Sequence, residues 1–268
     1  MITIPVSLRV LQRGHKLAKG VIFAFAPGQG GMAYNLAKQQ FGSINAGTPT
    51  LSATGWGMAA STDGTGDSYA FTGFPTTFSE LTVLWVGIVT ANASGFNEIM
   101  LHTSTSGNNG WYAVPYRVAG AGYMSFTKGG VIEALSTTLI TTFGTRYAMC
   151  FAGSDTADLV RCDLSTGNVA TDLGISLSGT PAAGNGTFSM GHYGDTGALP
   201  GFGLEGSTNL CIVWDRRLNL DEMLTVVRNP FGLVTPRRRE IVGKATVAAG
   251  GADAVPQCWA QYRRRRAG

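Results

Sequence analysis

Short apolar segments separated by turn residues run along most of the chain. Residues 81–89 (Leu-Thr-Val-Leu-Trp-Val-Gly-Ile-Val) form the most apolar segment, and this near-continuous pattern predicts a central strand buried on both faces. Residues 68–71 (Ser-Tyr-Ala-Phe) alternate instead, which predicts a strand with one face toward the core. About a dozen such segments with regular turn signals predict an all-β fold, a two-sheet antiparallel β-sandwich.

One short helix is predicted near the C-terminal end. Asn219 is a suitable N-cap, and Glu222 lies three residues later, where the second residue of a capping box belongs. Leu218 and Met223 have the spacing of a hydrophobic staple. The helix should end at Asn229 because Pro230 disfavours a helical residue before it. Its apolar face is predicted to comprise Leu220, Met223, Leu224 and Val227.

Two further turns and one proline refine the strand prediction. The sequence Asn108-Asn109-Gly110 is a turn signal, and an aromatic strand is predicted over 111–118. Pro115 interrupts that strand and cannot donate a backbone hydrogen bond, so the strand should lie at an edge or carry a bulge. Lys128-Gly129-Gly130 separates two apolar segments and predicts a hairpin.

The two terminal segments differ from the body of the chain. Residues 2–12 alternate in part and contain Pro5, which predicts an edge strand, either in the domain's own sheet or reaching a neighbouring subunit. From Gly243 the composition shifts to Ala, Gly and Val, and larger residues return from Val255. We therefore predict an N-terminal arm over 1–16, a jelly-roll domain over 17–242, and a linker with a basic docking tail over 243–268.

The composition argues against several classes of protein. Charged residues make up 13% of the chain, about half the usual share of roughly 25%. The net charge is +4, which equals the contribution of the four arginines at 263–266, so no basic face for nucleic acid is predicted. Neither a signal peptide nor an apolar run of about 20 residues is present, so no membrane partner is expected.

No catalytic or metal-binding motif stands out. Glycosidases need two neighbouring carboxylates, yet the closest glutamates, Glu205 and Glu222, are 17 residues apart. There is no His-Glu-x-x-His or Gly-x-Ser-x-Gly motif. Asp63 with Asp67, and Asp155 with Asp158, offer oxygens for calcium, but polar turns are the favoured interpretation. The four cysteines have no Cys-x-x-Cys pair; Cys150 and Cys211 lie in apolar runs and are predicted core residues. We expect no enzymatic activity, no metal and no cofactor.

Both ends of the predicted domain have motif-like detail. Residues 210–241 read LCIVWDRRLNLDEMLTVVRNPFGLVTPRRREI, a strand, a short helix, Asn-Pro and a Pro-Arg segment. Residues 17–26 form an opening strand, followed by a glycine turn at 27–31 and by Tyr34-Asn35-Leu36. Together these features resemble the laminin-G-like, concanavalin A-like jelly-roll domains of tailed-phage virion proteins over roughly 17–242. Asn35 stands where those domains more usually have aspartate.

The resemblance implies a non-enzymatic phage virion structural protein, either a capsid decoration or cement protein or a tail-fibre component. It would assemble in the host cytoplasm, reside in the virion, contact other capsid or tail subunits, and form a homo-oligomer, with a trimer as one option. The residues predicted to dock on such partners are Trp259, Tyr262, Arg263, Arg264, Arg265, Arg266, Arg237, Arg238 and Arg239.

The alternative function is a carbohydrate-binding module that adsorbs to glycans on a host surface. Aromatic rings supply stacking faces for sugars, although on a sandwich they more often belong to the core or to subunit contacts. The aromatic residues considered for stacking are Trp56, Trp111, Tyr112, Tyr116 and Tyr193, and the predicted glycan contacts are Trp111, Tyr112 and Tyr116.

Overall fold

The computed structural model describes residues 9–27, 33–64, 66–91, 96–103, 109–117, 121–128, 131–154, 156–176, 184, 186–191 and 203–236. The chain divides into two compact units, Met1–Arg237 and Arg238–Gly268. All of the described residues belong to the first unit.

The described part consists mainly of strands. The strands are β1 (Arg9–Leu11), β2 (Val21–Phe25), β3 (Tyr34–Asn35), β4 (Gln40–Phe41), β5 (Ser43–Ala46), β6 (Thr50–Thr54), β7 (Gly57–Asp63), β8 (Ser68–Phe71), β9 (Leu81–Val89), β10 (Phe96–Thr103), β11 (Asn109–Arg117), β12 (Ala121–Lys128), β13 (Val131–Ile140), β14 (Arg146–Gly153), β15 (Thr156–Asp163), β16 (Val169–Ser176), β17 (Phe188–Met190), β18 (Glu205–Trp214) and β19 (Val234–Pro236). The helical elements are η1 (Lys16–Ala18), α1 (Leu220–Arg228) and η3 (Pro230–Leu233). No helix among these is long and apolar enough to cross a membrane.

Ten strands form the larger sheet. Its order is β16-β15-β14-β9-β18-β2-β3-β4, and the β6–β7 hairpin joins it through β7, which pairs with the first half of β18. The second half of β18 pairs with β2, and β9 runs along the other side of β18. Strand β18 therefore pairs with β2, β7 and β9, each of which lies more than a hundred residues earlier in the chain.

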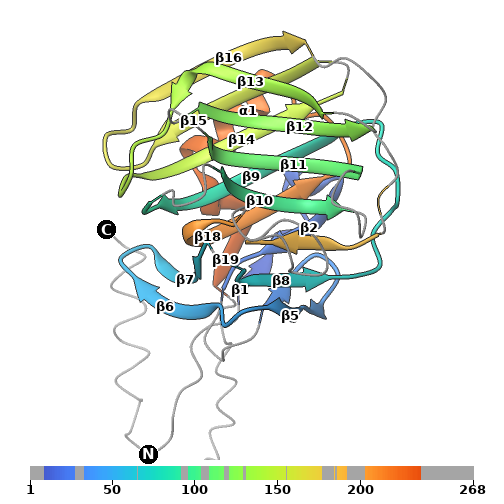
Figure 1. Ribbon diagram of the computed structural model, residues 1–268, viewed down its shortest axis with the longest axis vertical. Coiled ribbons are helices and arrows are strands. Elements are labelled where there is room, and N and C mark those ends of the chain that lie inside the picture. The colour runs from blue at the N-terminus through green and yellow to red at the C-terminus, as the bar shows by residue number, and fades with distance from the viewer. Residues whose placement is uncertain are drawn as a thin grey trace, which may run out of the picture. The chain divides into compact units, whose positions relative to one another are not determined.

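The second layer of the sandwich is formed by a four-stranded sheet, β10-β11-β12-β13, and a three-stranded sheet, β17-β8-β5. Strand β10 lies beside β17, and β11 and β12 lie against β9, β14 and β15 of the larger sheet. Figure 1 shows the four-stranded sheet in front of the larger sheet and α1 behind it. All strand pairs are antiparallel, which confirms the predicted two-sheet sandwich.

Both faces of the larger sheet carry a core. Because successive residues of a strand point to opposite faces, each central strand contributes alternate side chains to the two cores. On β9, Val83 and Trp85 pack between the sheets, whereas Leu84 and Val86 pack on the face that α1 covers. This confirms the prediction that 81–89 is buried on both faces.

The predicted helix begins where the capping box placed it. The Asn219 Oδ1 accepts from the backbone N–H of Glu222 at 3.0 Å, and Glu222 Oε2 accepts from the backbone N–H of Asn219 at 3.1 Å. Leu218 and Met223 are fully buried in the same core cluster, in agreement with the staple. The predicted apolar face is wrong at Leu220, which is 37% exposed. Val226 is buried instead, because the helix faces β14 and β15 through its last two turns.

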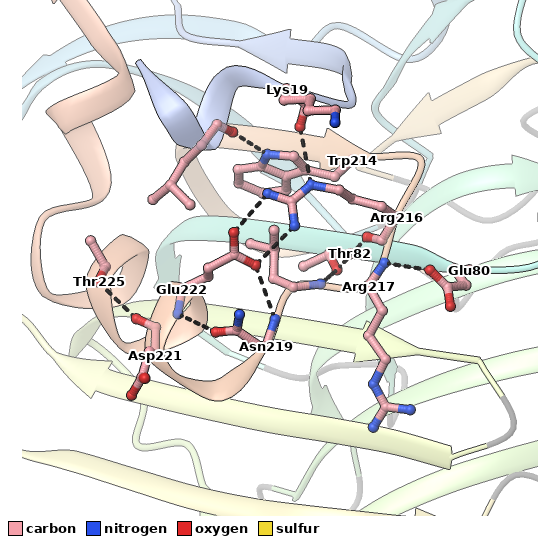
Figure 2. A network of polar contacts seen from close by, with 12 residues as sticks. Lys19, Glu80, Thr82, Trp214, Arg216, Arg217, Asn219, Asp221, Glu222 and Thr225 are labelled. Carbon is pink, nitrogen blue, oxygen red and sulfur yellow. Dashed lines mark hydrogen bonds and ion pairs between the residues drawn. The ribbon is translucent and has the colours of Figure 1, made fainter.

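Figure 2 shows the polar contacts that fasten α1 to the sheet. Arg216 pairs with Glu222 through two hydrogen bonds and donates from Nε to the Lys19 carbonyl at 3.1 Å. Arg217 pairs with Asp158 of β15 at 2.6 Å. Both guanidinium groups are thus occupied by contacts within the fold, and we assign this network a structural role.

The strand containing Pro115 occupies an inner position. Strand β11 lies between β10 and β12, so the prediction of an edge strand is wrong. The alternative prediction of a bulge is confirmed, because the β10–β11 register shifts between the Asn97–Tyr116 and Ile99–Ala113 pairs, next to the proline. The predicted hairpin around 128–130 is also confirmed, with Thr127 paired to Val131.

The described ends of the first unit lie side by side. Strand β1 pairs with β19, and the Cα partners include Arg9 with Pro236 and Leu11 with Val234. Residues 9–11 of the predicted arm therefore pair within their own chain. Residues 1–8 and 237–268 lie outside the described residues and continue the chain from this one strand pair.

Candidate functional site

One end of the larger sheet carries polar side chains on the face that α1 covers elsewhere. On β14, Ala148, Cys150 and Ala152 belong to the helix-side core, but Arg146 occupies the next position of that face and is only half-buried. We define the polar patch as the following residues of this end of the sheet: Thr54, Trp56, Ser61, Arg146, Ser207 and Asn209.

Two serines of the patch share its face through strand register. Ser207 pairs with both Ile88 of β9 and Ser61 of β7. Because Leu84 and Val86 of β9 lie on the helix side, Ile88 belongs to the same face, and so do its cross-strand partners. Both serines are partly exposed, and the Ser61 hydroxyl also lies 3.4 Å from that of Ser52.

Asn209 joins the strands of the patch. It lies at a register shift of β18, between the Thr208 and Leu210 pairs with β9, and its side chain is fully buried. A guanidinium N–H of Arg146 (Nη1) donates to its Oδ1. Its Nδ2 donates to the Met58 carbonyl at 3.1 Å and to Thr54 Oγ1 at 3.2 Å. A single amide therefore connects β14, β18 and the β6–β7 hairpin.

Trp56 is displayed at the tip of that hairpin. Its side chain is 43% exposed, and its backbone N–H donates to Thr54 Oγ1 at 3.2 Å, the same hydroxyl that Asn209 contacts. The hydroxyl in turn donates to the Gly57 carbonyl at 2.6 Å. Gly57 has φ = +98°, a conformation that favours glycine, so the chain reverses tightly and leaves the indole at the tip.

Arg146 has no acidic partner in the described part of the chain. The ion pairs found there join Arg216 to Glu222 and Arg217 to Asp158. Burial lowers the pKa of the Arg146 guanidinium, since desolvation disfavours its charge. The Asn209 amide oxygen that receives its N–H is uncharged, so no described residue neutralises the positive charge of Arg146.

The patch combines groups that suit a sugar. An exposed indole at the hairpin tip offers a flat apolar surface, and serine hydroxyls and a guanidinium on the adjoining strands offer hydrogen bonds. Both N–H groups of the Asn209 side-chain amide donate within the fold. Asn209 therefore supports the patch and does not contact a ligand. The side chains available to a ligand are those of Trp56, Arg146, Ser61 and Ser207.

The acidic loops considered for calcium have internal partners. Asp67 Oδ1 accepts from the backbone N–H of Thr48 at 2.6 Å, and its Oδ2 accepts from that of Asp63 at 3.2 Å. Asp158 pairs with Arg217 and accepts from the backbone N–H of Gly174. Among the described residues, no group of three or more His, Cys, Asp or Glu side chains could hold a metal ion. Asp155 lies outside the described residues.

The predicted glycan contacts Trp111, Tyr112 and Tyr116 all lie on β11, in the other sheet. Only their backbone is described. Tyr112 is in register with Met100 and Ser125, and Tyr116 with Asn97. The structure does not bring them to the polar patch. Trp56 is the aromatic residue that the sequence had singled out and that the patch contains.

Five of the six patch residues were missed by the sequence reasoning, namely Thr54, Ser61, Arg146, Ser207 and Asn209. Arg146 and Asn209 are polar positions in otherwise apolar strands, and that local contrast was the available signal. The predicted docking residues Trp259, Tyr262, Arg263, Arg264, Arg265, Arg266, Arg237, Arg238 and Arg239, and also Tyr193, lie outside the described residues.

Comparisons with known proteins identify the fold. No family model matches the chain, and no curated protein matches its sequence. Among solved structures, a Trypanosoma rangeli sialidase in complex with sialic acid is similar, with a TM-score of 0.50 and 12% identity over 80% of this chain and 33% of the sialidase chain. The binding domain of botulinum neurotoxin DC in complex with SialylT is also similar, with a TM-score of 0.52 and 7% identity over 78% of this chain and 50% of that chain.

These similarities establish the fold class. The chain has a concanavalin A-like, lectin-like β-sandwich. The aligned region spans about a third of the sialidase and half of the neurotoxin chain, and the identities are low, so the similarity concerns the fold alone.

Proposed function

We propose that this protein is a non-enzymatic glycan-binding module and that the polar patch is its sugar-contacting surface. One observation carries the proposal: the exposed Trp56 is fixed through the Thr54 hydroxyl to the buried Asn209, which also holds Arg146. The backbone that carries an exposed aromatic ring and a cationic donor are thus both held by one buried amide. Such pre-organisation reduces the conformational entropy lost on binding.

The fold similarities support this proposal over the others. The two similar structures are described as complexes with sialic acid and with SialylT. Those ligands belong to those proteins, and the shared fold supports the glycan-binding alternative for this chain. This reading is the alternative that the sequence left open.

The absence of enzymatic activity is part of the proposal. Glycoside hydrolysis requires two carboxyl groups that flank the scissile bond. The acids nearest to the patch in register are Asp63 and Glu205, which face each other two residues beyond the Ser61–Ser207 pair. Each of them makes further contacts within the structure. We therefore expect bound oligosaccharides to remain intact; turnover that Glu205→Gln abolishes would overturn this part.

A glycan array with matched variants tests the site. Trp56→Ala should abolish binding, whereas Phe41→Ala, which removes a 59% exposed ring from β4 of the same sheet, should not. Tyr116→Ala tests the β11 surface in the same assay. Binding that survives Trp56→Ala but is lost in Tyr116→Ala would move the site to the other sheet. Thermal unfolding of each variant verifies that it is folded.

A second candidate function is the virion structural role. We propose it as capsid decoration or a tail-fibre component that forms homo-oligomers and contacts other virion proteins through its ends. The β1–β19 pair supports it, because both terminal extensions continue from one strand pair and could attach the module at one place. Deletion of residues 253–268 should leave a folded domain that no longer joins particles. Normal incorporation of the truncated protein would refute the docking role of Trp259, Tyr262 and the four terminal arginines.

A further inference from the structure

Arg146 has a different kind of hydrogen-bond partner from Arg216 and Arg217, the two arginines that precede α1. Arg216 and Arg217 each face a carboxylate of the fold, at 2.8 and 2.6 Å. Arg146 lies on the same sheet and is also half-buried, but the acceptor that it contacts is the neutral amide oxygen of Asn209. A guanidinium has five N–H donors. Among the described residues nothing else receives a hydrogen bond from Arg146, so donors remain for a ligand.

The burial of Arg146 carries an unmet electrostatic requirement. Removing a guanidinium from water is unfavourable unless an opposite charge compensates for it. Within the described residues, the fold supplies a hydrogen bond but no carboxylate. An anion that binds at Arg146 would therefore gain a charge-assisted contact that no described carboxylate already makes.

The position of Trp56 indicates what the anion belongs to. The Asn209 amide contacts Arg146 through its oxygen and Thr54 through its nitrogen, and Thr54 holds the backbone of Trp56. The hairpin tip that carries the exposed indole is therefore linked to the guanidinium of Arg146 through the side chains of Thr54 and Asn209. Pyranose rings with an attached carboxylate match this combination, because the ring stacks on the indole and the carboxylate forms paired bonds with the guanidinium.

We infer that the ligand of the polar patch is a carboxylate-bearing sugar, such as a sialic or uronic acid residue, and that Arg146 recognises its carboxylate. This inference rests on the proposed glycan-binding function and specifies its substrate class. Ser61 and Ser207 lie on the same face and are available to the sugar hydroxyls.

Paired glycans test the inference directly. Sialylated and uronate-containing oligosaccharides are printed on an array beside their carboxyl-reduced counterparts, which differ only in having an alcohol in place of the acid. The tightest pair is then measured by titration calorimetry. The native protein should bind the acid form about tenfold or more tightly than the reduced form, as expected for loss of a charge-assisted contact.

Three variants assign the effect to Arg146. Arg146→Gln should lower affinity for the acid form to that of the reduced form and leave the reduced form unchanged. Arg146→Lys keeps the charge but not the planar fork, so it should restore part of the preference. Arg13→Gln removes the same charge from an exposed arginine whose side chain donates to the Ala37 carbonyl, and it should have no effect.

The outcomes distinguish failure of the carboxylate inference from failure of the proposed glycan-binding site. Equal binding of the acid and reduced forms by the native protein would refute the carboxylate inference and leave glycan binding intact. If neither form binds, or if Trp56→Ala binds as the native protein does, the proposed site fails and the inference fails with it. Should Arg146→Gln not fold, the comparison of the two glycans on the native protein still decides.

Discussion

Arg216 and Glu222 form an ion pair through two parallel hydrogen bonds, Nη1–Oε2 at 2.8 Å and Nη2–Oε1 at 2.9 Å. The same carboxylate accepts from the backbone N–H of Asn219 and so closes the capping box of α1. Arg216 also donates to the Lys19 carbonyl, next to the opening strand β2. One glutamate therefore links the start of the helix, through Arg216, to the other end of the chain.

Glu222→Gln should destabilise the protein in a pH-dependent manner. Arg216 hydrogen bonding holds the pKa of Glu222 below its ordinary value. The stabilisation is therefore complete above the unfolded-state pKa of about 4.3 and is lost as the pH falls through the lower folded-state pKa. We expect a difference of about 1 kcal/mol from the native protein at pH 7, shrinking below pH 4, in urea unfolding.

Asp221→Asn provides the matched control for this prediction. It removes a charge from the same first turn, so it weakens the interaction with the helix dipole, but it leaves the ion pair in place. A Glu222→Gln deficit that is no larger than that of Asp221→Asn, or that does not change with pH, would contradict the role assigned to the ion pair.

Thr208→Val should destabilise the core between the sheets. Trp85 Nε1 donates to Thr208 Oγ1 at 2.9 Å, and both side chains are buried. Valine has nearly the same shape but no acceptor, so the indole N–H would lose its partner at a cost of about 1–3 kcal/mol. Thermal or urea unfolding measures this loss. Thr208→Ser keeps the hydroxyl, and an equal loss in that variant would show that the hydrogen bond is not the cause.

Gly87→Ala should be strongly destabilising although the residue lies in a regular strand. An added Cβ would lie 2.2 Å from the Ser207 carbonyl oxygen and 2.3 Å from the indole of Trp85. Relieving these contacts requires movement of β18 or of the buried ring, and we expect a loss of about 3 kcal/mol or more. Gly55→Ala is the control, since its Cβ meets nothing within 4 Å. Comparable unfolding midpoints for the two variants would refute the steric argument.

The buried cysteines should be unreactive in the folded protein. Cys150, Cys162 and Cys211 are buried and free, and burial raises the pKa of all three thiols. Because the thiolate is the reactive form, a thiol reagent at pH 8 should modify none of them until denaturant is added. The measurement is made on Cys258→Ser, which removes the cysteine outside the described residues. Rapid release of one equivalent of chromophore from the native variant would contradict the prediction.

The secondary-structure expectations succeeded where the signal was local and strong. The capping residues Asn219 and Glu222 and the apolar run 81–89 each contain their own physical reason, a hydrogen bond within one turn or two apolar faces. The wrong predictions concern features that depend on neighbouring elements of the fold. Leu220 is exposed because the orientation of α1 depends on β14 and β15, and β11 is an inner strand because β10 and β12 flank it.

The candidate site illustrates the same division. The aromatic character of Trp56 and its place in a turn are legible from the residues around it. The position of Trp56 near Arg146 and Asn209 cannot be read from the sequence. These positions are distant along the chain and meet only because β7 and β9 pair with β18 and β14 pairs with β9.

Residue alternation, glycine turns and the helix cap were enough to specify the class of fold, because each acts over a few positions of the chain. Which polar residues share a surface was decided by strand order and register, which depend on contacts between remote segments. The link from Arg146 through Asn209 and Thr54 to the backbone of Trp56 belongs to the second kind of information.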